Sequence, residues 1–88
     1  MPHSIAVAVP CYNEEVTIAK VVRDFRKSLP AAAIHVFDNN SADRSADLAH
    51  EAGATIHRVR RQGKGHVMQA IFEKINVDIL IIVDGDDT

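Results

Sequence analysis

The chain has 88 residues, of which 47% are apolar and 25% are charged, and its formal net charge is −2. These values are typical of one soluble globular domain with a small core. The low charge and the 5% aromatic content argue against a nucleic-acid binder and a membrane-surface binder. The single Cys11 rules out an intrachain disulfide, and no apolar run approaches the roughly 18–20 residues of a transmembrane helix, so we expect a cytoplasmic protein.

The start of the chain predicts a buried strand followed by a helix. Residues 5–9 form a continuous apolar run with β-branched members, as in a parallel strand that is covered on both faces. Pro10 is expected to end this strand. Apolar positions at helical spacing then predict a helix over residues 14–29, with Asn13 as its N-cap and Pro30 after its end.

The middle of the chain repeats the same order. Residues 33–38 predict a second short strand, which is followed by polar loop residues. Asp43 can cap a helix that continues to about residue 52, and Gly53 stands where a helix C-terminus favours glycine. Residues 54–59 predict a third strand.

The last third adds a third helix and a fourth strand. After the basic loop RRQGKG, Gly65 or His66 is expected to open a helix that runs to about residue 75, and residues 77–84 predict a strand. The order β-α-β-α-β-α-β requires an α/β fold with a parallel sheet and helices on its faces.

The polar residues gather in the segments that follow the four strands. These segments read PCYNEE, DNNSAD, RRQGKG and DGDDT. In open parallel α/β sheets, ligands bind beyond the carboxyl ends of the strands, where helix N-termini also favour anions. We therefore expect one rim of the sheet to carry the functional site.

The acidic turn after the fourth strand predicts a metal site. Asp84 and Asp86 form an Asp-x-Asp turn directly after a buried strand, and hard carboxylate oxygens are the ligands that Mg²⁺ or Mn²⁺ accepts. Crowded carboxylates repel one another unless a cation lies among them. The alternative is a solvated acidic turn.

Other polar residues leave two interpretations open. Arg60, Arg61 and Lys64 beside glycines suit a phosphate, but also a solvated basic loop. Tyr12 can stack on a base or pack against the sheet.

The neighbouring amide and thiol positions are equally ambiguous. Asp38 and Asn39 can bind a base or ribose, or form an Asx turn. Cys11 is expected to be a packing residue, and the scattered histidines, including His35 and His57, lack metal-ligand spacing and are expected to be structural or solvated.

Taken together, VPCYNEE, VFDNNSADRS, RRQGKG and VDGDDT, in this order, resemble the nucleotide-sugar-binding half of family 2 glycosyltransferases. The resemblance covers essentially the whole chain and is closest to polyprenol-phosphate sugar transferases and related bacterial branches. It implies a three-layer α/β/α, Rossmann-like sheet of the GT-A type with strand order 3-2-1-4, and places residues 1–88 in the N-terminal part of such a domain.

The resemblance also implies roles for residues around the nucleotide. Pro10 and Tyr12 would border the base, and Glu14 would face the nucleotide pocket. Asp38 and Asn39 would contact the base or ribose, although many members have aspartate where Asn39 stands.

At the phosphate end, the resemblance implies a metal-assisted transfer. Lys64 would approach the phosphates, Asp84 would lie nearer the ribose, and Asp86 would bind Mg²⁺ or Mn²⁺, with Asp87 as a secondary candidate. The donor would be a UDP- or GDP-sugar and the acceptor a polyprenyl phosphate or a glycan. The sugar would be transferred with inversion.

In the family, the general base, the acceptor site and the rest of the sheet follow the Asp-x-Asp motif. We therefore expect a truncated domain that binds nucleotide weakly and does not transfer sugar. An unpaired sheet edge also predicts self-association.

Two other interpretations remain open from the sequence. Asp84, Asp86 and Thr88 after an apolar strand also resemble the nucleophile motif of haloacid-dehalogenase-type phosphatases, although that motif usually follows the first strand of its domain. The second alternative is a non-catalytic nucleotide-binding or assembly module with the same fold.

Overall fold

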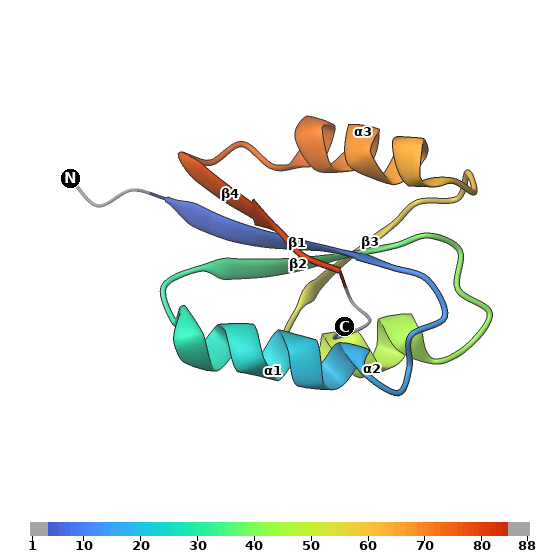
Figure 1. Ribbon diagram of the computed structural model, residues 1–88, viewed down its shortest axis with the longest axis horizontal. Helices are drawn as coiled ribbons and strands as arrows, with labels where there is room; N and C mark the ends of the chain where they lie inside the picture. Colours follow the sequence, from blue (N-terminus) through green and yellow to red (C-terminus); the bar gives the residue numbers. More distant parts are fainter. Residues whose placement is uncertain (1–3, 85–88) are drawn as a thin grey trace.

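The computed structural model describes residues 4–84 of the chain (Figure 1). Strands and helices alternate throughout these residues, which confirms the predicted β-α order. The elements are β1 (Ile5–Cys11), α1 (Ile18–Ser28), β2 (Ala33–Asp38), α2 (Ser45–Glu51), β3 (Thr55–Arg58), α3 (Lys64–Lys74) and β4 (Ile79–Ile82).

The strands form a parallel sheet with the order β3-β2-β1-β4, which confirms the predicted order 3-2-1-4. Within the described residues, α1 and α2 cover one face of the sheet and α3 covers the other (Figure 1). The predicted three-layer α/β/α architecture is therefore also confirmed. Because all four strands are parallel, their carboxyl ends and the loops that follow them lie at one rim.

The first strand is longer than the sequence predicts, because Pro10 does not end it. Pro10 pairs in register with Phe37, and the strand continues through Cys11. The Ala8 carbonyl accepts a hydrogen bond from Val83 on the β4 side, whereas the Cys11 carbonyl accepts one from Asn39 on the β2 side. Backbone groups of successive residues point to alternate sides of a strand, so those of Pro10, like those of Ala8, point toward β4. The pairing of β1 with β4 ends at Ala8. The N–H that proline lacks is therefore not needed for any hydrogen bond between the strands.

The first helix begins later than predicted, at Ile18 instead of residue 14, and its N-cap position is Thr17. Asn13 has a positive φ of 49°, so it belongs to a turn before the helix and does not cap it. Its side-chain oxygen accepts a hydrogen bond from the Ala42 backbone at 2.8 Å. The Asn13 side-chain oxygen, which the sequence predicts to cap the first helix, therefore binds the loop after β2 instead.

The other helix boundaries differ from the prediction by about one residue. The α2 helix begins at Ser45, whose backbone N–H donates to Asp43 at 2.9 Å, so Asp43 does satisfy a terminal N–H of this helix. The α3 helix begins at Lys64, because Gly63, with a φ of 130°, takes the N-cap position. Gly53, with a φ of 110°, follows α2 as predicted, and a Cβ there would clash with the Arg26 guanidinium.

The two outer strands are shorter than predicted. Residues 54–59 yield the four-residue β3, and residues 77–84 yield the four-residue β4. Each outer strand pairs on one side within the described residues, so its ladder covers only the part that faces β1 or β2. A prediction from apolar composition alone therefore includes residues at the strand ends that do not pair with a neighbouring strand.

Apolar side chains pack into two clusters, one on each face of the sheet. The larger cluster joins β1 and β2 to α1 and α2; its buried members are Val7, Val9, Cys11, Ile18, Val21, Val22, Ile34, Val36, Ala49 and Ala54. The smaller cluster lies under α3; its buried members are Ala8, Phe37, Val59, Val67 and Ile71. The predicted buried character of the first two strands follows from this two-sided covering. Within residues 4–84, no helix is both long enough and apolar enough to span a bilayer.

Candidate functional site

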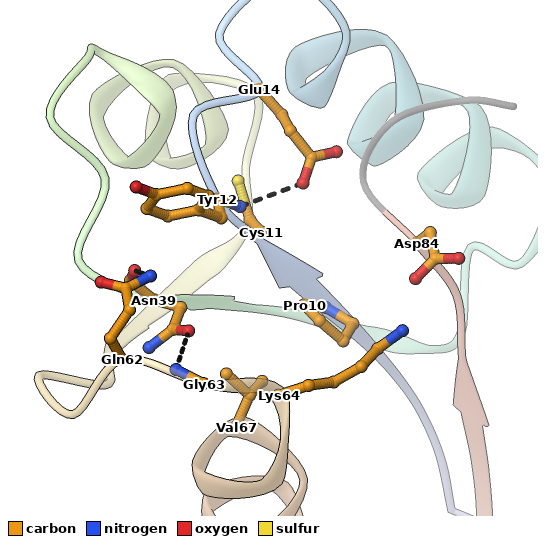
Figure 2. Close-up of a pocket in the computed structure, with 10 residues that line it drawn as sticks. All are labelled: Pro10, Cys11, Tyr12, Glu14, Asn39, Gln62, Gly63, Lys64, Val67 and Asp84. Atoms are coloured by element: carbon orange, nitrogen blue, oxygen red, sulfur yellow. Dashed lines mark hydrogen bonds between the residues drawn. The ribbon is translucent and has the colours of Figure 1, made fainter.

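A pocket of about 330 Å³ lies at the carboxyl-end rim of the sheet, which is the rim that the sequence predicts. This volume falls at the lower end of the range for small-molecule sites. The pocket lies between the end of β1, the loop before α3, the first turn of α3 and Asp84, two residues after the end of β4 (Figure 2).

The β1 side of the pocket is formed by Pro10, Cys11, Tyr12 and Glu14. The Tyr12 side chain is 50% exposed. Its backbone N–H donates to Glu14 Oε1 at 3.0 Å, which holds the Glu14 carboxylate over the turn that follows β1 (Figure 2). An exposed ring at the mouth of a pocket provides an apolar face on which a planar ligand can stack.

The turn after β1 is joined to the loop after β2 by reciprocal hydrogen bonds. The Asn13 backbone N–H donates to Ser41 Oγ at 2.9 Å, and the Ala42 backbone N–H donates to Asn13 Oδ1 at 2.8 Å. Each loop therefore satisfies backbone groups of the other, and together they form a wall that we call the β1–β2 wall, residues 12–15 and 38–45.

Ser45 and Asp43 extend the same wall. Ser45 Oγ accepts the Glu14 backbone N–H at 2.7 Å, and Asp43 accepts the Glu15 backbone N–H at 3.2 Å. Burial raises the pKa of Asp43, but hydrogen bonds from the Ser45 side chain and from backbone N–H groups outweigh it, so the net direction of the pKa is downward. Asp43 is therefore held as a carboxylate that accepts hydrogen bonds from both loops.

Cys11 is a packing residue, as predicted. Its side chain is 2% exposed. Burial, followed by the nearby charge of Glu14, raises the pKa of the thiol to about 12. A thiol with this pKa is a poor nucleophile at neutral pH, so the cysteine beside the pocket does not suit covalent catalysis.

Asn39, the first residue after β2, also lines the pocket and is 6% exposed. Its side-chain Nδ2 donates to the carbonyls of Val59 at 3.1 Å and Arg61 at 2.8 Å, and its Oδ1 accepts the Gly63 backbone N–H at 3.0 Å (Figure 2). These bonds hold the segment that we call the β3–α3 loop, residues 59–63. The sequence gives Asn39 two open roles, ligand contact or turn formation, and the structure places it at the pocket with its carboxamide bound to this loop.

Asp38 lies next to Asn39 but does not line the pocket. Its carboxylate is 1% exposed, accepts hydrogen bonds from the Ser41 hydroxyl and backbone, and lies 3.9 Å from the Arg58 guanidinium. It faces a separate depression together with Arg58 and Ser41. Both hydrogen bonds from Ser41 lie within the loop that follows β2, so they are local bonds of the kind that the turn interpretation predicts, although the N–H belongs to the residue three positions on and not two.

The far side of the pocket carries one described cation and one described carboxylate, Lys64 and Asp84. Lys64 is the first residue of α3, and Figure 2 shows its side chain extending to the side of the pocket where Asp84 lies. Val67, one turn further along α3, contributes an apolar patch. Asp86 and Asp87 lie outside the described residues 4–84.

The remaining loop cations face elsewhere. Arg60 and Arg61 are exposed and line a different depression, together with His66. Of the three cations that the sequence groups as phosphate candidates, the structure therefore brings Lys64 to the pocket. Within the described part of the chain, no cluster of three or more metal-binding side chains is found.

The histidines at the centre of the chain pair with each other. His35 Nδ1 lies 2.9 Å from His57 Nε2, and the His57 ring stacks on Phe37 at 4.5 Å between centroids. Burial, followed by the charge of the partner His57, lowers the pKa of His35; burial, followed by the charge of Lys74, lowers the pKa of His57. These contacts agree with the structural role that the sequence predicts.

The structure thus brings most of the predicted site residues to one pocket. Those that line it are Pro10, Tyr12, Glu14, Asn39, Lys64 and Asp84. Sequence reasoning missed Gln62, Gly63 and Val67 as pocket residues. Gln62 and Gly63 stand inside the RRQGKG segment, and Val67 lies three residues after Lys64 on the same helix face, so the helical spacing is the signal that could have found it.

The profile of the family described as "Glycosyl transferase family 2" matches residues 6–88. Protein RfbJ of Shigella flexneri is 53% identical over 90 residues, an alignment that covers all of this chain and 70% of that protein. Glycosyltransferase AglJ of Haloferax volcanii is 35% identical over 88 residues and is matched over 29% of its length. The chain thus spans most of the first relative and less than a third of the second.

Solved structures agree with these relatives. Glucosyl-3-phosphoglycerate synthase of Mycobacterium tuberculosis aligns with a TM-score of 0.89 at 25% identity, over 98% of this chain and 36% of that enzyme. A structure of the same enzyme in complex with Mn²⁺, UDP and glucosyl-3-phosphoglycerate aligns with a TM-score of 0.86 at 25% identity, over 94% of this chain and 33% of that enzyme. The GT-A-type architecture expected from the sequence is confirmed by these alignments.

Proposed function

The chain belongs to glycosyltransferase family 2, and on that premise we propose that residues 1–88 form the N-terminal, nucleotide-sugar-binding part of a GT-A glycosyltransferase domain. The observation that carries this proposal is the pocket at the carboxyl-end rim. Six residues that the family resemblance selects line it, although they come from four separate segments of the chain. In this proposal Asp84 and Asp86 form the Asp-x-Asp motif of the family, and the family match supports this interpretation over the phosphatase one.

The proposed donor is a UDP- or GDP-sugar. Its base would lie against Pro10 and Tyr12, where a half-exposed ring borders the pocket. Lys64 would bind the phosphates at the start of α3, a position at which a helix N-terminus also favours negative charge. Asp84 would lie nearer the ribose.

A divalent metal fits the chemistry of this end of the pocket. Asp84 places an exposed carboxylate at the rim, and carboxylate oxygens are the donors that Mg²⁺ and Mn²⁺ prefer. Asp86 and Asp84 would hold the ion, with Asp87 as a secondary ligand. When bound, such an ion neutralises the charge that develops on the departing diphosphate. The Mn²⁺ and UDP complex of the M. tuberculosis enzyme supports this choice of metal.

We propose that the parent protein transfers the sugar, a hexose in our interpretation, with inversion to a polyprenyl phosphate or glycan acceptor. In the family, the general base and the acceptor site follow the Asp-x-Asp motif. The 88-residue chain is therefore expected to bind the donor without transferring its sugar. Release of sugar from UDP- or GDP-sugars to an added acceptor by this chain would contradict that expectation.

Thermal-shift and calorimetric titrations with UDP, GDP and their sugars, with and without Mn²⁺, test the donor proposal. Binding to the folded state raises the melting temperature according to the ratio of ligand concentration to Kd. Lys64→Met and Asp84→Asn should each weaken binding, whereas Lys74→Met, which removes an exposed lysine from the far end of the same helix, should not. Absence of any shift with every nucleotide would defeat the proposal.

We further propose that the chain self-associates through the outer edge of β4. Within the described residues β4 pairs on one side, with β1, and two of its side chains remain exposed, Ile79 at 42% and Ile82 at 38%. An unpaired apolar edge is a template for strand pairing. Sedimentation velocity over a wide concentration range should show a dimer that Ile82→Lys removes; a monomer at all concentrations would contradict the proposal.

A further inference from the structure

We propose that Asn39 is a positioning residue of the nucleotide site, which holds the β3–α3 loop (residues 59–63) through its carboxamide and does not select the base of the donor. The inference rests on the proposed nucleotide-binding function and deepens it, because it assigns a different task to a residue that the family resemblance places against the base or ribose.

The hydrogen bonds of the carboxamide carry the inference. A side-chain amide has two N–H donors and one carbonyl oxygen with two acceptor lone pairs. Both donors are directed at backbone carbonyls, those of Val59 at 3.1 Å and Arg61 at 2.8 Å, and the oxygen accepts the Gly63 N–H at 3.0 Å. The opposite amide orientation would place the oxygen against two carbonyls, so this network fixes which end is nitrogen. Both N–H donors and one of the two lone pairs of the oxygen are therefore engaged by the β3–α3 loop, so this amide has no N–H left to donate to a base.

Asn39 can act as a clamp because its own backbone is fixed to the sheet. Its N–H donates to the Cys11 carbonyl at 2.8 Å, and its carbonyl accepts the Gln62 side-chain Nε2 at 3.2 Å. The residue is 6% exposed, so water competes little for these bonds. The β3–α3 loop begins with a backbone hydrogen bond from Val59 to the Asp38 carbonyl at 2.8 Å, and the residues that follow are tied to the central strands through the Asn39 side chain and the Gln62 contact.

The loop in turn positions the phosphate end of the pocket. Gly63, whose N–H Asn39 Oδ1 accepts, occupies the N-cap position of α3, and Lys64 follows as the first helical residue. Gly63 and Lys64 both line the pocket, as does Gln62. A shift of the loop would therefore move the cation and the helix start that face the phosphates, which every nucleoside diphosphate shares.

Aspartate at this position cannot reproduce the clamp. A carboxylate has no N–H donor, so it would place a negative oxygen against the carbonyls of Val59 and Arg61. The bond to Gly63 would survive. The structure thus explains why an asparagine, and not an aspartate, serves in this chain.

The experiment compares Asn39→Asp and Asn39→Ala with Asn76→Asp. The last variant makes the same chemical change at an exposed position between α3 and β4, outside the pocket and its walls. Affinities for UDP and GDP in the presence of Mn²⁺, and amide hydrogen exchange of Gly63 without ligand, are measured for each. We expect both Asn39 variants to weaken UDP and GDP by the same factor, about tenfold, and to speed Gly63 exchange by at least a similar factor, whereas Asn76→Asp changes neither.

The outcomes separate the clamp from base recognition. A base-reading residue would change the ratio of UDP to GDP affinity and leave Gly63 exchange at its wild-type rate, and that result would overturn the inference. If Asn39→Asp does not fold, Asn39→Ala, which introduces no charge, decides by the same two measurements. If the wild-type chain binds no nucleotide, the proposed function fails, while Gly63 exchange in the free protein still supports or overturns the clamp.

Discussion

The two walls of the pocket are built in different ways. In the β1–β2 wall, residues 12–15 and 38–45, side chains from each loop bind backbone groups of the other, as Asn13 and Ser45 show. In the β3–α3 loop, residues 59–63, a backbone hydrogen bond joins Val59 to the Asp38 carbonyl, and among the described residues the side-chain bonds that hold the rest of the loop involve Asn39, through its carboxamide and through its carbonyl, which accepts from Gln62. The side-chain supports of the first wall come from several residues, whereas those of the second converge on one.

The β1–β2 wall also stands over more buried apolar side chains than the β3–α3 loop does. The β1–β2 wall stands over the larger cluster under α1 and α2, whereas the β3–α3 loop leads into α3, which packs on the smaller cluster. A wall with several supports should tolerate the loss of one, because the remaining bonds keep its groups in place. The comparison teaches that nucleotide affinity should be most sensitive to changes on the α3 side.

The largest effect is expected from a matched pair of core substitutions. Ile71→Ala and Ile18→Ala each truncate a side chain with 0% exposure, the first under α3 and the second under α1. Each should lower the free energy of unfolding by about 2–5 kcal/mol in urea denaturation. Nucleotide affinity of the folded fraction should fall with Ile71→Ala and change little with Ile18→Ala; equal losses would remove the proposed asymmetry.

A smaller effect is expected from one support of the β1–β2 wall. Ser45→Ala leaves the Glu14 N–H without its acceptor in a site where Ser45 is 0% exposed, so it should lower the free energy of unfolding by about 1–3 kcal/mol. Ser28→Ala, at an exposed position near the end of α1, should stay within about 0.5 kcal/mol. Nucleotide affinity should be nearly unchanged, and a tenfold loss would show that this wall is not redundant.

A modest pH effect is expected on the α3 side. The pKa values of His35 and His57 are lowered from 6.5, so the unfolded chain binds more protons below that pH. Their contribution to stability is present above pH 6.5 and is lost as the pH falls below it. Lys74 is the charged group that faces His57 and adds to the repulsion.

Urea denaturation between pH 7.5 and 5 measures this effect. His57→Gln should flatten the decline in the free energy of unfolding, whereas His50→Gln, at an exposed position on α2, should leave the slope as in the wild type. Identical slopes for wild type and His57→Gln would show that the pair does not couple to folding.

The smallest expected effect is an absence of reaction at Cys11. With a pKa of about 12, against an ordinary 9.0, the thiol has about a thousandfold less thiolate at pH 8. Iodoacetamide labelling, followed by mass spectrometry, should be very slow for the folded chain and fast in urea. Rapid labelling of the folded chain would mean that the β1–β2 wall opens at the end of β1.

Much of the site was predictable because it follows from strand order. Tyr12, Lys64 and Asp84 each follow or lie near the carboxyl end of a strand, and parallel pairing alone brings such residues to one rim. The helix starts were less predictable. Asn13 has the composition of an N-cap, but its oxygen binds Ala42, 29 residues away in the chain, and no local pattern reports such a partner.

The sequence by itself determined the alternation of strands and helices, the parallel sheet, and the rim at which a ligand would bind, because hydrophobic periodicity and chain order are local properties. Only the tertiary structure decided that Pro10 remains inside β1, that Asp38 lines a depression separate from the pocket, and that Asn39 is bound to the β3–α3 loop. The physical reason is that a polar side chain binds whichever complementary group the fold brings within about 3 Å, and that partner is often distant in sequence.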